Sequence, residues 1–189
     1  MPVTIAVLAL QGAFIEHERM LDRLCVRHIE IRESADIDRT FDGLILPGGE
    51  STVQGRLLRE LGLFAPLRER IAAGMPVFGT CAGLLLLAKQ MDNDDRCHFA
   101  LMDIVAKRNA YGRQLGSFST IGDFSGHSEV PMTFIRAPYI DRTTSPEVKV
   151  LSVVKGKIVA ARERNMLVTA FHPELTQDTT VHEHFLDML

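Results

Sequence analysis

The sequence predicts an α/β fold in which a mostly parallel central sheet is flanked by helices. Residues 3–10 (VTIAVLAL) form an unbroken apolar run rich in β-branched residues, which is typical of a strand buried on both faces. Through the first half of the chain such runs alternate with segments of helical periodicity, and this alternation indicates parallel strands joined by helices. No internal repeat, low-complexity tract or interdomain linker interrupts the pattern, so residues 1–189 are expected to form a single domain.

In the first half of the chain, particular residues indicate where the expected strands and helices begin and end. Gln11-Gly12 ends the first strand, and a helix follows in which apolar residues recur every three or four positions up to Cys25, which is expected in the core. Ser51 or Thr52 could cap the helix that follows the third strand. The expected elements are, in order, strand 3–10, helix 14–25, strands 29–33 and 43–49, helices 51–61 and 65–74, strand 75–80 and a buried helix 82–91.

The second half changes to short extended runs after a polar loop at 91–98. Lys155-Gly156-Lys157 separates two of these runs and is typical of a hairpin turn. Residues 120–132 (TIGDFSGHSEVPM) are expected to be a loop. The expected strands lie within 102–108, 132–140, 148–154, 157–163 and 166–172, and an amphipathic helix closes the chain over 179–189.

The composition excludes several classes of protein. The chain has 189 residues, of which 46% are hydrophobic and 24% charged, with a net charge of −3, so nucleic acid and anionic membrane are not expected partners. No apolar run reaches the length of a membrane span, and the N-terminus lacks the pattern of a secretory signal. The three cysteines, Cys25, Cys81 and Cys97, have no C-x-x-C spacing, which favours a reducing cytoplasm over a disulfide framework or a zinc site.

Cys81 stands in the sequence Gly79-Thr80-Cys81-Ala82-Gly83, at the expected junction of a strand and a helix. The pattern G-x-C-x-G is the thiol version of the nucleophile elbow, in which flanking glycines relieve crowding at a sharp turn. The backbone N–H of Ala82 would then point to where an oxyanion forms. A buried structural cysteine is the alternative interpretation of Cys81. Cys97, in the polar loop, is interpreted as an exposed residue without a catalytic or ligand-binding role.

A thiol nucleophile needs a base, and His172 is the candidate. It ends a buried-looking strand, and Pro173 favours an extended conformation for it, so that Glu174 can lie beside its ring and orient it. A helix that starts at Pro173-Glu174 after a capped histidine is the alternative. The other histidines are expected on helical surfaces (His17, His182, His184) or in turns and loops (His28, His98, His127).

Two further segments are expected at the same edge of the sheet. LPGGES (46–51) follows a strand, and its glycines allow close approach of a ligand and an N–H from near Gly49 to the same oxyanion. A tight turn before a helix would explain the segment equally well. Gln11-Gly12 ends a neighbouring strand, and ligands of open α/β sheets bind at these carboxyl ends.

These residues make the chain resemble the class I glutamine amidotransferases. More narrowly, it is similar to the glutaminase subunit of pyridoxal 5′-phosphate synthase, the PdxT family. G-x-C-x-G and H-P-E mark only the superfamily, whereas L-Q-G, P-G-G-E-S-T and F-I-R-A-P together are more specific. The resemblance covers nearly the whole chain and is carried by LALQGAFIEH (8–17), LILPGGESTV (44–53), FGTCAGLLLLAK (78–89), RNAYGRQ (108–114), FIRAPYI (134–140) and AFHPEL (170–175).

The resemblance implies a flavodoxin-like three-layer sandwich and a glutaminase with Cys81 as nucleophile and His172 and Glu174 as its partners. Such an enzyme hydrolyses L-glutamine to L-glutamate and ammonia through a γ-glutamyl thioester, without a metal or organic cofactor. The ammonia would pass to the synthase subunit, PdxS, in a hetero-oligomer with equal copies of both subunits. Partner docking near Gln11 and Gly12 is expected to switch activity on. The residues implied to contact glutamine are Gly49, Glu50, Ser51, Arg108, Ile135 and Arg136.

Three other functions remain open at this point. The chain could be a glutaminase that serves a different synthase, or a cysteine hydrolase or chaperone of the DJ-1 type. The presence of LPGGES and H-P-E weighs against the second. It could also be a regulatory subunit that has lost activity, which the intact Cys81, His172 and Glu174 disfavour.

Overall fold

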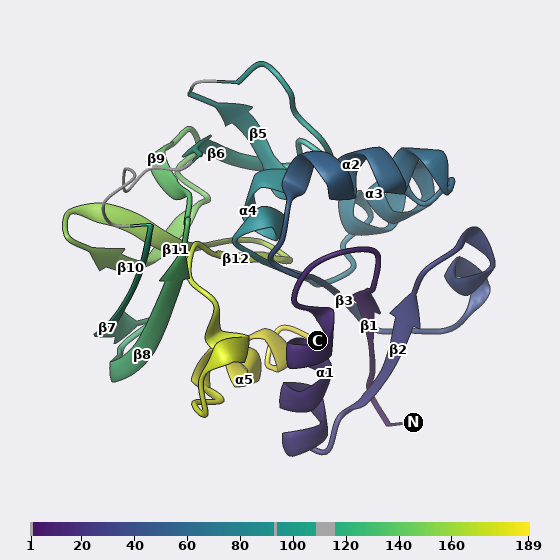
Figure 1. Ribbon diagram of the computed structural model, residues 1–189, viewed down its shortest axis with the longest axis horizontal. Coiled ribbons are helices and arrows are strands. Elements are labelled where there is room, and N and C mark those ends of the chain that lie inside the picture. The colour runs from purple at the N-terminus through teal and green to yellow at the C-terminus, as the bar shows by residue number, and fades with distance from the viewer. Residues whose placement is uncertain (1, 93, 109–115) are drawn as a thin grey trace.

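The computed structural model describes residues 2–92, 94–108 and 116–189 and has the expected α/β architecture (Figure 1). The strands are β1 (Thr4–Leu8), β2 (Arg27–Ile31), β3 (Gly43–Leu46), β4 (Val77–Thr80), β5 (Ala88–Met91), β6 (Met102–Lys107), β7 (Ser117–Phe124), β8 (His127–Ile135), β9 (Tyr139–Thr143), β10 (Lys149–Val154), β11 (Lys157–Glu163) and β12 (Met166–Thr169). The helices are α1 (Phe14–Arg23), α2 (Ser51–Glu60), α3 (Phe64–Ala72), α4 (Ala82–Leu87) and α5 (Thr180–Leu186), with 3₁₀ turns η1 (Ser34–Asp38) and η3 (Pro173–Leu175).

The central sheet is mixed and largely parallel. Its strand order is β2-β1-β3-β4-β12-β11-β9-β6-β5, with β10 paired to β11. The strands from β2 to β12 in this order run parallel, whereas β11 is antiparallel to its neighbours. In Figure 1, the helix that follows β1 lies on one face of the sheet, and the helix that follows β3 lies on the other. The carboxyl ends of β1 and β3 therefore form a switch point, where open α/β sheets bind their ligands.

Helices cover both faces of this sheet, which gives three layers. Figure 1 shows α1 and α5 together on one face and α2, α3 and α4 on the other. Strands β3, β4 and β12 are buried along their whole length, as the unbroken apolar runs predict for strands covered on both faces. None of the helices in the described part of the chain has the length and apolar character needed to cross a lipid bilayer.

The predicted helix over 82–91 is only partly correct. Helix α4 ends at Leu87, Ala88 has an extended ψ of 132°, and Ala88–Met91 forms strand β5, which pairs in parallel with β6. The four leucines of α4 are all buried, as expected. An apolar run of this kind cannot be assigned to helix or strand by periodicity, because it has no polar face to reveal its period.

The predicted loop over 120–132 is wrong. Strands β7 and β8 form an antiparallel hairpin, joined by Ser125 and Gly126, whose φ angles of 49° and 86° are those of a two-residue turn that fits the twist of a hairpin. Pro131 obscures the strand in the sequence, since proline normally argues against a central strand. The hairpin is a separate two-stranded sheet, and proline is tolerated there.

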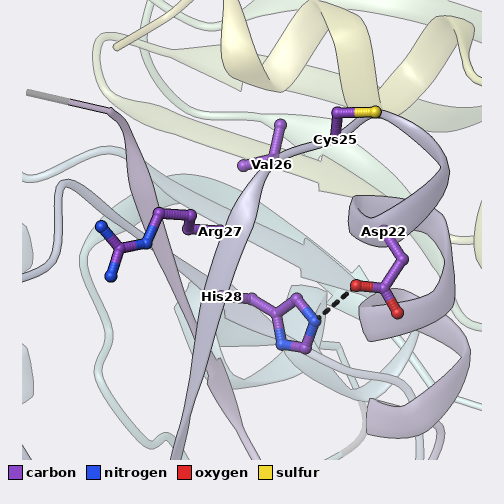
Figure 2. Close-up of a pocket in the computed structure, with 5 residues that line it drawn as sticks. All are labelled: Asp22, Cys25, Val26, Arg27 and His28. Atoms are coloured by element: carbon purple, nitrogen blue, oxygen red, sulfur yellow. Dashed lines mark hydrogen bonds and ion pairs between the residues drawn. The ribbon is translucent and has the colours of Figure 1, made fainter.

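The core position predicted for Cys25 is also wrong. Helix α1 ends at Arg23, and Cys25 has a φ of 56° in the turn that leads to β2, where its side chain is exposed. It lines a small pocket of about 320 Å³ together with Asp22 and His28, and His28 Nε2 lies 3.0 Å from Asp22 Oδ1. Figure 2 shows these side chains. The helical periodicity places Cys25 on the apolar side only if the helix continues, and it stops before that residue.

The buried leucines of α4 give a test of the core. Leu86→Ala removes a fully buried side chain, so we expect it to lower the free energy of unfolding by about 2–5 kcal/mol. Ile121→Ala deletes the same number of carbon atoms from a side chain that is 66% exposed, and it should lower that free energy by about 1 kcal/mol or less. Urea unfolding of both variants measures the difference. Equal losses would contradict the packing described for α4.

Candidate active site

Four of the segments singled out in the sequence meet at the carboxyl ends of four adjacent parallel strands. β1, β3, β4 and β12 are neighbours in the sheet and lead to Gln11, Gly48, Cys81 and His172 respectively. Strand order, rather than position in the sequence, brings these four segments together. The site therefore lies at the switch point of the sheet.

Cys81 occupies a sharp turn between β4 and α4. Its φ of 50° and ψ of −96° are strained for a residue with a side chain, and strained backbone is concentrated at functional sites. The Cys81 N–H donates to the Thr169 carbonyl at 2.8 Å, which fixes the turn to β12. A Cβ on Gly79 would overlap the backbone of Gly83, and a Cβ on Gly83 would overlap the Leu46 carbonyl of β3. This is the geometry that the G-x-C-x-G pattern predicts.

His172 and Glu174 lie side by side in the interior. The His172 Nδ1 and Glu174 Oε1 atoms are 2.6 Å apart, and both side chains are almost fully buried. The His172 N–H donates to the Thr133 carbonyl of β8 at 2.8 Å, so the unexpected hairpin holds the backbone of this residue. The predicted contact is confirmed, although the chain enters the 3₁₀ turn η3 at Pro173 instead of continuing extended.

The environment of His172 favours its protonated form. Burial lowers its pKa, but interactions with Cys81 and with the Glu174 carboxylate outweigh burial and raise the pKa of His172 to about 10. The ring therefore carries a positive charge at neutral pH. An imidazolium between a cysteine nucleophile and a carboxylate is suited to deliver a proton to a leaving group.

Two glycine-containing loops are joined beside the His172 ring. Gly48 lies so close to this ring that a Cβ would overlap it, so the position requires glycine. The Ala13 N–H donates to the Gly48 carbonyl at 2.9 Å, and the Glu50 N–H donates to Gln11 Oε1 at 2.8 Å.

A buried glutamine that sequence reasoning missed also connects these loops. Gln54 Nε2 donates to the carbonyls of Gln11 and Pro47, at 2.9 and 3.1 Å. The sequence could have indicated Gln54, because it lies on the buried face of the helix that begins at Ser51.

A cavity of about 1040 Å³ opens beside Cys81. Leu85, Pro138 and Leu175 add apolar surface to it; they lie within motifs quoted above but were not predicted as site residues. Every predicted site residue except Glu174, which lies behind His172, contributes to the lining: Gln11, Gly12, Gly49, Glu50, Ser51, Cys81, Ala82, Arg108, Ile135, Arg136 and His172.

Two polar side chains in this cavity have hydrogen-bonding capacity to spare. Ser51 was expected as a possible helix cap, but the cap of α2 is Glu50, and the buried Ser51 Oγ has no partner among the described residues. Arg108 Nη1 donates to Thr52 Oγ1 at 3.2 Å, and its Nη2 lies 3.6 Å from the Asp94 carboxylate. In the described part of the chain, the Nε and Nη2 groups of Arg108 make no hydrogen bond.

The surface positions predicted for His17 and His182 are wrong, because both rings are fully buried. His184 is half-buried and forms a T-shaped ring contact with Phe124. The signal for His17 was present in the sequence, since it falls on the apolar stripe of α1 between Phe14 and Leu21. Its polarity outweighed that pattern in the prediction.

Two remaining predictions concern residues outside this group. Cys97 is half-buried, and its thiol donates to the Lys89 carbonyl at 3.1 Å, away from the cavity. The RNAYGRQ motif lies outside the described residues except for Arg108. Within the described ranges, no three His, Cys, Asp or Glu side chains are grouped so that they could hold a metal ion.

Comparisons with known proteins agree with this geometry. A family model described as the SNO glutamine amidotransferase family matches residues 7–189. The pyridoxal 5′-phosphate synthase subunit PdxT of Haemophilus influenzae (strain PittEE) is 53% identical, over 97% of each chain. The protein of the same name from Methanocorpusculum labreanum is 58% identical, over 98% of this chain and 97% of its own.

Solved structures extend the comparison to the fold. A crystal structure described as a glutamine amidotransferase superimposes with a TM-score of 0.91 at 38% identity, over 97% of each chain. PurLQS from Thermotoga maritima is similar in fold alone, with a TM-score of 0.68 at 13% identity, over 100% of this chain and 97% of that one. The resemblance seen in the sequence is thereby confirmed, and the chain belongs to the SNO glutamine amidotransferase family.

Proposed function

We propose that this chain is the glutaminase subunit of a pyridoxal 5′-phosphate synthase. It hydrolyses the side-chain amide of L-glutamine and supplies the ammonia for vitamin B6 biosynthesis in the cytoplasm. The observation that carries the proposal is the convergence of Cys81, His172 and Glu174 beside a large cavity in a chain of this family. Neither a metal nor an organic cofactor takes part in the reaction.

The first half-reaction forms a thioester. The Cys81 thiolate attacks the amide carbon of glutamine, and the carbonyl oxygen becomes an oxyanion. As the C–N bond breaks, protonated His172 gives its proton to the nitrogen, so that ammonia leaves and a γ-glutamyl thioester remains. Glu174, 2.6 Å from Nδ1, keeps the ring oriented and stabilises its positive charge.

The second half-reaction restores the enzyme. Neutral His172 accepts a proton from water, and the resulting hydroxide attacks the thioester carbon. The C–S bond then breaks, glutamate leaves and the Cys81 thiolate is regenerated beside protonated His172. The N–H groups of Gly49 and Ala82 stabilise the oxyanion in both halves.

The free amino-acid end of glutamine requires partners of both signs. Arg108 lines the cavity and carries a guanidinium suited to bind a carboxylate, so it is assigned to the α-carboxylate. Glu50 is exposed at the same cavity and is assigned to the α-ammonium, and the unpartnered Ser51 Oγ supplies a further hydrogen bond. Ile135 and Arg136, at the end of β8, complete the substrate-binding surface.

The partner is the synthase subunit, PdxS, in a complex with equal copies of both chains. The peptide whose Gly49 N–H is assigned to the oxyanion hole is anchored through its carbonyl, Gly48 O, on the Ala13 N–H at 2.9 Å. Gly12, with a φ of 99°, immediately precedes Ala13. A partner that docks on Gln11 and Gly12 would therefore move this peptide and set the oxyanion hole.

The nucleophile is tested by replacing each cysteine in turn. Cys81→Ala and Cys81→Ser should reduce glutamate formation at least about a thousandfold, because neither side chain supplies a thiolate. Cys25→Ala and Cys97→Ala are the matched controls and should retain activity, since neither thiol lines the cavity. Full activity of Cys81→Ala, with an unchanged circular dichroism spectrum, would overturn the mechanism.

Substrate recognition is tested at Arg108. Replacing a charged donor by Arg108→Gln should raise KM for glutamine about ten- to a hundredfold, the loss expected for a charge-assisted hydrogen bond. Arg142→Gln, which changes an exposed arginine paired with Asp141, is the control and should leave KM unchanged. If KM also stays constant in Arg108→Gln, this residue does not bind substrate.

Dependence on the partner is tested by titration. Glutamate formation per active site should be low for the isolated chain and should rise to a plateau as the synthase subunit is added. The physical reason is that docking stabilises the competent arrangement of the Gly48–Gly49 peptide. Maximal activity without the partner would disprove the switch, while leaving the glutaminase assignment intact.

A further inference from the structure

A buried pair of histidines lies directly behind Glu174. His17 on α1 and His182 on α5 have no exposed surface, and their Nδ1 and Nε2 atoms are 3.0 Å apart. The other nitrogen of His17, Nε2, lies 3.1 Å from Thr80 Oγ1 and 3.6 Å from Glu174 Oε2. Phe78 forms T-shaped ring contacts with both rings. Two helices from distant parts of the chain thus place imidazoles between the core and the candidate active site.

Both rings are neutral at physiological pH. Burial, together with the nearby His182 and His172 rings, lowers the pKa of His17 well below its usual value. Burial alone lowers the pKa of His182 to about 3. Each ring therefore carries a single N–H, and the contacts decide which nitrogen holds it.

One assignment of these protons satisfies the contacts best. If His182 Nε2–H donates to His17 Nδ1, the proton of His17 is on Nε2 and faces Thr80 and Glu174. His182 Nδ1, which has no partner among the described residues, is then only an unused acceptor. The opposite assignment would bury an N–H on His182 Nδ1 without an acceptor and turn the Nε2 lone pair of His17 toward a carboxylate. Leaving a buried donor unpaired is costly, so the first assignment is favoured.

Glu174 needs a hydrogen-bond donor on this side. Its Oε1 contacts His172, but its Oε2 is buried and makes no hydrogen bond to any described residue. His17 Nε2 is hydrogen-bonded to Thr80 Oγ1 at 3.1 Å, and it is also the ring nitrogen that faces Oε2, at 3.6 Å. We propose that His17, kept in one tautomer by His182, is a positioning residue: the positive end of its Nε2–H dipole attracts Oε2 and so keeps Oε1 on His172. The proposal rests on the catalytic role proposed for His172 and Glu174.

This role is positional, since His17 neither lines the cavity nor transfers a proton. Without the N–H of His17, the Glu174 carboxylate can rotate about its bond to Cγ. Oε1 then contacts His172 Nδ1 for a smaller fraction of the time. Groups that orient a catalytic or ligating histidine from behind commonly change its performance about ten- to a hundredfold. The same order of effect is expected here.

The first test compares kinetic constants of variants in the complex with the synthase subunit. His17→Leu should lower kcat about tenfold or more and leave KM for glutamine nearly unchanged, since substrate contacts are intact. His17→Gln can place an amide N–H near Glu174 and should recover much of the loss. His184→Leu on the same helix as His182 is the matched control and should keep full activity, because His184 contacts Phe124 rather than the triad.

The second test is the pH profile of kcat/KM. Although burial lowers the pKa of His172, interactions with Cys81 and Glu174 raise it to about 10, so the positive charge of the ring is present below that pH and lost above it. If Glu174 is less well oriented, it raises the pKa of His172 less. In His17→Leu, the fall of kcat/KM on the alkaline side of the profile should therefore occur at lower pH. Simple destabilisation of the fold would reduce the active fraction without moving the limb.

The third test reads the tautomers in the unaltered protein, so it does not depend on the folding of a variant. Long-range ¹H–¹⁵N correlation spectra should show His17 and His182 both neutral and both protonated on Nε2. A proton on His17 Nδ1, or unchanged kcat and pH limb in a folded His17→Leu, would overturn the proposal. Neither result would contradict the catalytic role proposed for Cys81, His172 and Glu174. That role is tested separately, by the activity of Cys81→Ala.

Discussion

The buried contact between His172 and Glu174 is the interaction around which the candidate active site is arranged. A carboxylate inside a protein is stable only if its oxygens have partners, because water no longer solvates them. His172 contacts one oxygen at 2.6 Å, and the His17 ring faces the other. The remaining parts of the site then adapt to the position of the His172 ring: Gly48 has no side chain where the ring lies, and Thr133 holds the backbone.

The loops of the site are held by side chains because the sheet cannot hold them. Parallel strands stop pairing at their carboxyl ends, and the backbone groups beyond them need other partners. The Gln54 side chain supplies two such hydrogen bonds, to the carbonyls of Gln11 and Pro47. Gln11 Oε1 accepts a third bond from the Glu50 N–H. The loops after β1 and β3 are therefore connected to each other more directly than to the rest of the surface.

The sequence predicts the parts of the structure in which local chemistry and global fold agree. The strands that lead to Cys81 and His172 are buried and largely apolar, and the glycines around Cys81 have a steric reason that the spacing of the motif alone indicates. Failures occurred where a local pattern is ambiguous. An apolar helix and an apolar strand look alike at Ala88, and Pro131 disguised a strand of the hairpin.

The histidines show a further limit of sequence reasoning. His17 and His182 lie far apart in the chain, and each has a partner only when α1 and α5 meet on the same face of the sheet. A polar residue on an apolar stripe is read as exposed unless its partner is known. The fold was thus predictable from the sequence, as was the triad contact, whereas the polar cluster behind it depends on tertiary contacts that no local pattern records.

The position of β12 has a consequence for the order in which the molecule is completed. This strand lies in the sheet between β4 and β11, yet in the sequence it follows every other described strand. During synthesis from the N-terminus, β4 therefore emerges with an unpaired edge where β12 will later insert, and the turn at Cys81 lacks the Thr169 carbonyl that accepts its N–H. Long-range pairing of this kind is slow because a large loop must close before the contact forms. The nucleophile is thus made early but acquires its surroundings only after β12 and His172 have been translated, so a nascent chain that stops short of them has no means of releasing ammonia.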